Sequence, residues 1–164
     1  MMVGGIWHMV CTPLWGAYGE ARVQGDWDWL WRTHRRALKL TALAASFSYA
    51  GLAVFGTEII RVWAGPGSVP HPMVLLVLCG YGMMSASNTV HSTVLNALGR
   101  VRYQAAAHLV QAVLIVGLVT LLTRKWASAG AAVALLAGTI ASTGWMLPYG
   151  VQREYKRMDR GSIA

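Results

Sequence analysis

This sequence is poor in charge. Only 12% of its 164 residues are Asp, Glu, Lys or Arg, whereas 55% are hydrophobic and the mean hydropathy is +0.45. A soluble globular domain carries about 25% charged residues. A chain with half that fraction lacks the polar surface that a soluble monomer needs, so the composition disfavours a water-soluble domain.

Cysteine is also scarce. The two cysteines, Cys11 and Cys79, lie inside apolar stretches and form no C-x-x-C pair. This excludes a disulfide framework and a cysteine-based zinc site. We expect both residues to act as small buried apolar side chains.

Motifs that carry catalysis are missing as well. The sequence contains no G-x-x-x-x-G-K-[ST], no H-E-x-x-H and no G-x-S-x-G, and its five histidines are scattered. We therefore expect no enzymatic activity, no nucleotide site, no metal and no cofactor. The formal net charge of +8 does not indicate nucleic-acid binding. Its basic residues sit between apolar segments and in the tail, where anionic lipid headgroups would meet them.

Long apolar segments are what the sequence does contain. Residues 41–60, 73–98, 103–123 and 126–151 are almost free of charge, with Glu58 the single exception. A helix needs roughly 20 apolar residues to cross a bilayer. Residues 1–18 are apolar, lack a basic start and a cleavage site, and resemble the second half of a further span. The prediction is an all-α, polytopic transmembrane helix bundle with four full spans and a partial N-terminal span.

The connectors predict the orientation of this bundle. Successive connectors fall on opposite sides, and Lys and Arg are enriched in cytoplasmic loops. The sparse side has Arg61, Arg124 and Lys125. The rich side, which we expect to be cytoplasmic, has Arg22, Arg32, Arg35, Arg36, Lys39, Arg100, Arg102, Arg153, Lys156, Arg157 and Arg160. The expected organisation is a partial helix (1–18), a cytoplasmic interfacial stretch (19–40), a four-helix transmembrane bundle (41–151) and a basic cytoplasmic tail (152–164) in the cell inner membrane.

The 19–40 connector has its own helix signals. Asp26 is suited to cap the N-terminus of a helix. The negative charge of Asp28 would stabilise the first turn of that helix through the helix dipole. Trp27, Leu30 and Trp31 then share one face, as an interfacial helix requires. Two roles are open for Arg32, Arg35 and Arg36: general lipid anchoring, or contact with a diphosphate headgroup.

Polar residues inside the spans are costly and often mark a pathway. Asn88 and His91 are three residues apart in one span, and His108 and Gln111 repeat that spacing in the next, so each pair shares a helical face. The four side chains either line a polar, substrate-binding cavity or hydrogen-bond between helices as structural contacts. Glu58 is expected to reach water or to pair with Arg61. A run of small residues permits close helix packing without a functional reason: Ala127, Gly130, Ala131, Ala134, Gly138 and Ser142.

The order of several short motifs resembles a known family. The motifs are Pro13-Leu14-Trp15, Gly19-Glu20-Ala21 with Gly25-Asp26, Ile59-Ile60-Arg61-Val62-Trp63-Ala64-Gly65, Leu95-Asn96-Ala97-Leu98-Gly99-Arg100 and Ala129-Gly130-Ala131-Ala132-Val133-Ala134. Together they resemble the C-terminal part of the polysaccharide (O-antigen and exopolysaccharide) flippases of the multidrug/oligosaccharidyl-lipid/polysaccharide exporter superfamily. The chain departs from the family pattern at Ala97, where glycine is usual.

The resemblance implies a function. Family members enclose a cavity between two lobes of helices, and this chain corresponds to the closing spans of the second lobe. The implied activity is alternating-access export of an undecaprenyl-diphosphate-linked oligosaccharide for cell-surface polysaccharide or lipopolysaccharide synthesis, driven by an ion gradient. We expect a C-terminal fragment that needs a partner chain to supply the missing lobe, with membrane lipids and the lipid-linked oligosaccharide as its other partners.

Other functions stay open. A multidrug exporter of the same superfamily would have the same helices but would favour buried acids for cationic substrates. An integral-membrane enzyme of glycan or lipid assembly would show clustered Asp, Glu or His at loop edges, for which Asp26 and Asp28 are the nearest match. A small structural membrane protein, or a non-functional remnant, is a third alternative.

Overall fold

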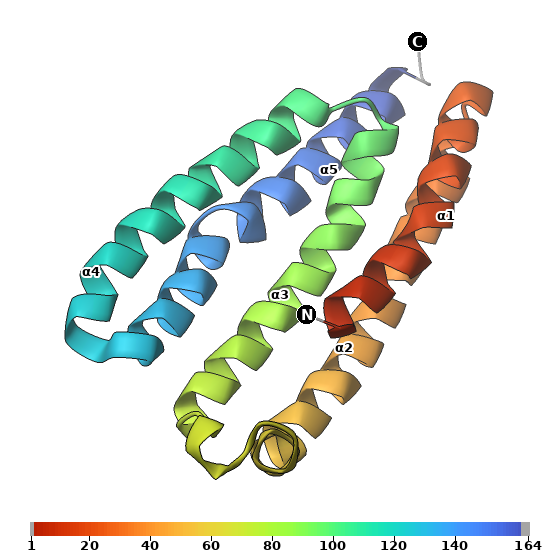
Figure 1. The fold of residues 1–164 in the computed structure, drawn as a ribbon. Helices are drawn as coiled ribbons and strands as arrows, with labels where there is room; N and C mark the ends of the chain where they lie inside the picture. The colour runs from red at the N-terminus through yellow and green to blue at the C-terminus, as the bar shows by residue number, and fades with distance from the viewer. Residues whose placement is uncertain (1, 162–164) are drawn as a thin grey trace.

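The protein is an all-α bundle (Figure 1). The computed structural model describes the backbone of residues 2–161 and the side chains of residues 13–158. Cys11 and residues 159–164 of the expected tail therefore lie outside the described side chains. The elements are α1 (Met2–Gln24), α2 (Trp27–Ala64), the 3-10 turn η1 (Pro66–Ser68), α3 (Pro72–Ala97), α4 (Val101–Ala141) and α5 (Thr143–Gly161).

Three helical stretches are long and apolar enough to cross a membrane: Trp27–Ala64, Pro72–Ala97 and Val101–Met158. The third folds back on itself, because the backbone leaves helical geometry at Ala127 with φ 45° and ψ −125°. Figure 1 shows the two arms of this stretch side by side, with the reversal at the end of the bundle that also holds the α2–α3 connection. The expected segments 103–123 and 126–151 belong to these two antiparallel arms.

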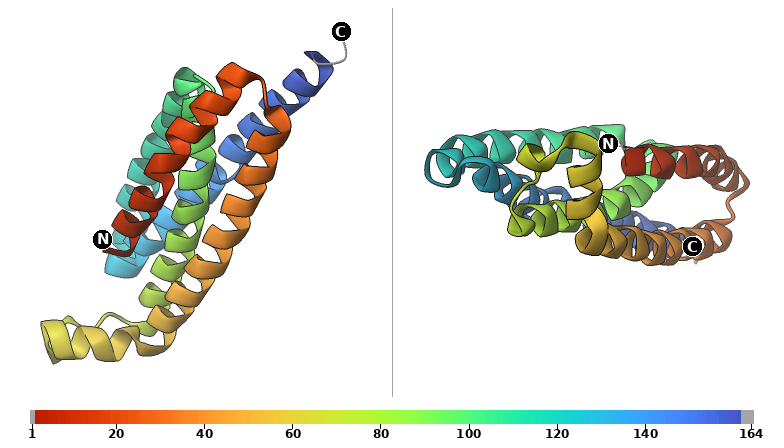
Figure 2. Two further views of the ribbon diagram at one scale, coloured as in Figure 1. Left: turned by 90° about the vertical axis from the view of Figure 1, so that its right-hand side faces the viewer. Right: turned by 60° about the horizontal axis from the view of Figure 1, so that its bottom comes forward.

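The two ends of the bundle differ in charge as the sequence predicts. The α1–α2 turn, the α3–α4 turn and the C-terminal part of α5 lie at one end of the bundle (Figure 1 and the left view of Figure 2). The Arg-rich connectors belong to that end, and Arg61, Arg124 and Lys125 belong to the other. Gly25 and Gly99 supply the positive φ angles of 73° and 71° at which the chain reverses at the Arg-rich end.

The 19–40 region differs from its expected form. It is helical except at Gly25 and Asp26, and α2 runs from Trp27 through the apolar segment without a break. The predicted cap is confirmed, since Asp26 Oδ1 accepts a hydrogen bond from the Trp29 N–H at 3.0 Å. Charged side chains do not end a helix when no glycine or proline interrupts it, so the interfacial helix and the span form one element.

The Trp27, Leu30 and Trp31 face also packs differently from the interfacial expectation. Leu30 is buried, and both tryptophans pack against the main core cluster instead of turning to lipid. That cluster joins all five α-helices at the Arg-rich end: Tyr18, Ala21, Leu30, Val94, Leu95, Ala97, Leu98, Ala107, Leu147 and Val151. The 152–158 part of the expected tail continues α5 and is held there by the ring of Tyr155, which stacks on Trp31 with centroids 4.4 Å apart.

The expected 126–151 span is interrupted. Helical geometry fails at Ser142, which separates α4 from α5 with φ −124° and ψ −94°. Pro148 lies within α5 and has no N–H to donate to a preceding turn. The result is a broken helix whose two parts meet beside the middle of α3, where Asn88 of α3 contacts Thr143 of α5.

Candidate functional site

One face of α3 is polar along its length. Hydroxyl and amide side chains recur there at three- and four-residue steps: Tyr81, Ser85, Asn88, Thr89, Ser92, Thr93 and Asn96. Residues at these steps share one side of a helix. The first and last of them are 15 residues apart, which corresponds to roughly 22 Å along the helix axis. A polar stripe of this length inside an apolar span is costly unless protein or water faces it.

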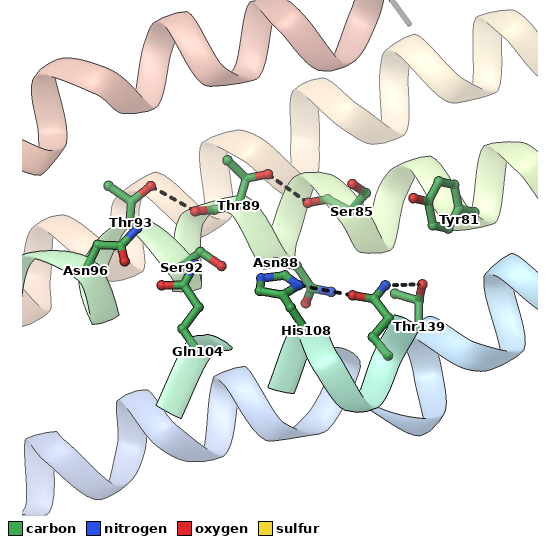
Figure 3. A pocket seen from close by; sticks show the side chains of 11 residues that line it. Tyr81, Ser85, Asn88, Thr89, Ser92, Thr93, Asn96, Gln104, His108 and Thr139 are labelled. Atoms are coloured by element: carbon green, nitrogen blue, oxygen red, sulfur yellow. Dashed lines mark hydrogen bonds between the residues drawn. The ribbon is translucent and has the colours of Figure 1, made fainter. Parts of the chain in front are cut away.

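This stripe is one wall of a pocket of about 420 Å³. Gln104, His108 and Gln111 of α4 form the opposite wall, and Thr139 from the second arm of α4 closes one end (Figure 3). The volume lies within the range of about 300–1,000 Å³ that is usual for small-molecule sites. The pocket lining includes no Asp, Glu, Lys or Arg.

A directed chain of hydrogen bonds fixes the α4 wall. Thr139 Oγ1 donates to the Leu135 carbonyl at 2.8 Å and accepts from Gln111 Nε2 at 2.8 Å. The Gln111 amide oxygen can then only accept, so the His108 ring donates from Nδ1 across 3.2 Å. The chain holds His108 in one orientation, and a neutral ring in that tautomer keeps Nε2 as an acceptor.

Asn88 has a partner at the helix break. Its Nδ2 donates to Thr143 Oγ1 at 2.9 Å, and both residues are buried. The bond ties the centre of α3 to the first residue of α5. Asn88 therefore lines the pocket and supports its wall at the same time.

Gln104 differs from its neighbours. Among the side chains that the structure describes, its buried Oε1 is one of a few polar atoms without a hydrogen-bond partner. The residue lines the pocket but this oxygen is itself buried, so a hydroxyl or an N–H group of an occupant reaches it only when the amide turns toward the pocket. Leaving such an atom unpaired costs about 1–3 kcal/mol, which an occupant that donates a hydrogen bond would offset.

The structure places three of the four sequence-predicted cavity residues at this pocket. Asn88, His108 and Gln111 line it, whereas His91 does not. The His91 ring instead lies beside His34 of α2, with ring centroids 5.1 Å apart. The three-residue step between Asn88 and His91 leaves them about 60° apart around the helix, and this rotation directs His91 to a different neighbour.

Other lining residues were not predicted. Ser85, Thr89, Ser92 and Thr93 are present in the sequence as a stripe, but serine and threonine in apolar helices commonly bond their own backbone. Thr89 and Thr93 do so here, to the carbonyls of Ser85 and Thr89. No local sequence pattern indicated that Thr139 lines a pocket, because only the reversal at Ala127 brings it there.

The predicted headgroup residues lie on the surface of α2. Arg32, Arg35 and Arg36 are all exposed, near the start of the helix. Arg32 Nε donates to the Asp28 carbonyl at 3.2 Å, and the Arg35 guanidinium lies 4.9 Å from the Trp31 ring centroid. The predicted Glu58–Arg61 pair is confirmed, at 2.7 Å on the exposed surface of the other end.

Within the part of the chain that the structure describes, no group of three or more His, Cys, Asp or Glu side chains is placed to hold a metal ion. Comparisons of the chain with protein-family models, with curated proteins and with solved structures find no match. By length and composition, the three apolar helical stretches suggest a multi-pass membrane protein with a charge-free polar pocket along α3.

Proposed function

We propose that this chain is part of a membrane transporter that exports a lipid-linked oligosaccharide, with undecaprenyl diphosphate as the lipid carrier. The observation that carries the proposal is the pocket of amide and hydroxyl side chains between α3 and α4. The resemblance of the short sequence motifs to polysaccharide flippases supports the same substrate class.

The chemistry of the lining favours sugar over ions. Sugar hydroxyls both donate and accept hydrogen bonds, and amides and hydroxyls offer both roles. A cationic drug would favour a buried carboxylate, and the pocket lining has none. Among the side chains that the structure describes, the buried acidic residue is Glu154, and it is already paired with Arg100 at 2.8 Å.

The openness of the pocket supports a role as one wall of a larger carrier. Asn96 and His108 line the pocket yet are exposed on the bundle surface. Polar groups at membrane depth are unfavourable against lipid, so a second set of helices is the natural cover. We propose that these helices come from another chain or from another part of a longer protein, and that the five helices alone do not complete transport.

The broken helix supports a substrate pathway at this place. Substrate sites in secondary transporters typically form where a membrane helix is discontinuous near the middle of the bilayer. The α4–α5 break at Ser142 lies next to Thr139 of the pocket and Thr143, the partner of Asn88. In this arrangement the sugar lies along α3, and Arg32, Arg35 and Arg36 are proposed to contact the diphosphate at the cytoplasmic surface.

Binding by the complete chain in lipid nanodiscs tests the proposal. The probe is undecaprenyl diphosphate linked to an oligosaccharide of neutral sugars, and the comparison is undecaprenyl diphosphate without sugar. We expect Gln104→Leu to weaken binding of the sugar-linked lipid by roughly three- to tenfold, because one hydrogen bond is lost. Binding of the sugar-free lipid should not change.

Gln24→Leu is the matched control, because Gln24 is exposed and its amide bonds Glu20 within α1, away from the pocket. Equal affinity of the unsubstituted chain for the two lipids would contradict a sugar site. Full transport by this chain alone, in a strain without any other such carrier, would contradict its role as one wall.

A further inference from the structure

A buried histidine and a half-buried histidine from different helices face each other outside the pocket. His34 of α2 is 1% exposed, and His91 of α3 lies with its ring centroid 5.1 Å from that of His34. The Nδ1 atoms of both rings are buried and, among the described side chains, have no hydrogen-bond partner. Buried polar atoms are nearly always bonded, so two unpartnered imidazole nitrogens in one place call for a functional reason.

The surroundings of the pair are aromatic. The Trp31 ring lies 5.8 Å from that of His34, and the ring of Tyr155 of α5 stacks on Trp31. A tryptophan within about 6 Å attracts a cation through its ring face. An imidazolium at His34 would gain this interaction. In a site without water, however, the hydration free energy that the charge loses is much larger than the attraction that one tryptophan ring supplies.

No carboxylate compensates a charge at this site, within the part of the chain that the structure describes. Arg35 of α2 lies over Trp31, and α1 contributes the buried hydroxyl of Tyr18 to the same end of the bundle. On α5, Glu154 next to Tyr155 is already bonded to Arg100 and lies 3.5 Å from Arg157. The packed arrangement of α2 on α3 therefore favours two neutral rings.

Separation of the two helices reverses this preference. Each histidine lies roughly 10 Å along its helix axis from the Arg-rich end of the bundle. His34 is that far from the start of α2, and His91 is that far from the end of α3. Parting α2 from α3 at that end would admit water to both rings. A hydrated imidazole binds a proton near pH 6.5, and two charged rings would then repel each other and hold the helices apart.

We propose that His34 and His91 form a proton-binding site, empty while α2 packs on α3 and filled by one proton on each ring when the helices separate, and that these protons are the ions that drive the carrier. The unprotonated nitrogen of each neutral ring accepts its proton, and repacking of α2 on α3 returns both protons to water. The coupling to transport rests on the proposed function, whereas proton binding does not.

Distance measurements between spin labels test the site in the complete chain in nanodiscs. Labels are placed at Lys39→Cys on α2 and Arg102→Cys in the first turn of α4, both exposed, with Cys11→Ser and Cys79→Ala as background and with EDTA in every sample except one metal control. Lowering the pH from about 8 to about 5 should move the labels to longer distances. His34→Gln with His91→Gln should abolish the shift, and His71→Asn, an exposed helix cap, should keep it.

A distance that does not change with pH, or a shift that survives in the double variant, would overturn the proposal. A shift that is seen only when EDTA is omitted would overturn it too, because the ligand would then be a metal ion. NMR spectra of ¹⁵N-labelled histidine in the unsubstituted chain report the protonation of each ring directly. This measurement does not depend on how the variants fold. Two rings must stay neutral at about pH 6, where exposed histidines are mostly protonated, and must become charged only as the helices separate.

The two proposals fail in different ways. If the labels move but the sugar-linked lipid is not bound, the proton site stands and the transport function is wrong. If the lipid is bound but the labels do not move, the pocket stands and the proton site is wrong.

Discussion

At the scale of single residues, the ion pairs of this protein differ in what surrounds them. Glu58 and Arg61 are both more than half exposed on one helix. Glu154 is 10% exposed and bridges α5 to Arg100 of the α3–α4 turn at 2.8 Å, with Arg157 at 3.5 Å. A buried carboxylate depends on its partners, whereas an exposed one is solvated by water.

This contrast gives a stability prediction. Arg100→Met should lower the free energy of unfolding by about 1–3 kcal/mol, because it leaves the Glu154 carboxylate with its more distant partner alone. Arg61→Met, the matched control, should change it by less than about 1 kcal/mol. Thermal unfolding followed by circular dichroism in nanodiscs measures both. Equal effects of the two substitutions would contradict the assigned burial.

The polar residues show how far single positions can be predicted. Asn88, His108 and Gln111 could be placed at one site because amides and imidazoles are rare inside apolar spans. His91 met the same criterion and yet lies against His34 instead of the pocket. Helical spacing predicts which side of its helix a residue occupies, but it does not predict which other helix packs against that side. Gln104 lies in the first turn of α4 and was not singled out, although it holds the unpartnered acceptor of the pocket.

At the scale of helices, small residues determine how closely the two arms of the third apolar stretch approach. Gly130, Ala134, Gly138 and Ser142 are all buried and follow at four-residue steps. A Cβ atom at Gly130 would overlap the carbonyl group of Leu122, and one at Gly138 would lie 2.6 Å from Ile115 Cγ1. The predicted close packing is therefore confirmed at Gly130 and Gly138, whereas Ala127 is exposed at the reversal and Ala131 is half-buried.

Gly130→Ala should be destabilising by about 1–3 kcal/mol, since backbone atoms cannot move aside as a flexible side chain can. Gly117→Ala is the control, because a Cβ there meets nothing within 4 Å and alanine favours a helix over glycine by about 0.5–1 kcal/mol. Chemical unfolding of the purified chain in detergent compares them. A neutral Gly130→Ala would mean that the two arms are farther apart.

The apolar segments could be predicted as helices because an uncharged segment of this length rarely forms anything else. The boundaries of the helices could not be predicted. Charged residues between 27 and 40 suggested a separate interfacial element, but they are helix-compatible and α2 continues through them. The break at Ser142 was missed because a glycine- and alanine-rich run looks uniform in sequence, while Asn88 and Thr143 join there only in three dimensions.

At the scale of the whole molecule, apolar and polar surfaces are divided between faces. Large apolar side chains are exposed along α2 and α4, as a lipid-facing surface requires, whereas the pocket brings amides and hydroxyls to one face of α3. A pocket that is polar, uncharged and open is suited to a hydrated sugar passing a bilayer. The pocket is therefore expected to hold water and to bind substrate at membrane depth.

Reactivity of a cysteine in the pocket tests that claim most directly. In the background without Cys11 and Cys79, Ser92→Cys lies in the pocket wall, and Phe47→Cys lies on the exposed apolar face of α2. With a membrane-impermeant thiol reagent added from the cytoplasmic side, the account predicts that Ser92→Cys reacts much faster than Phe47→Cys. It also predicts that the lipid-linked oligosaccharide slows this reaction, whereas the sugar-free lipid does not. Equal reactivity at the two positions, or no protection by the sugar-linked lipid, would contradict the account.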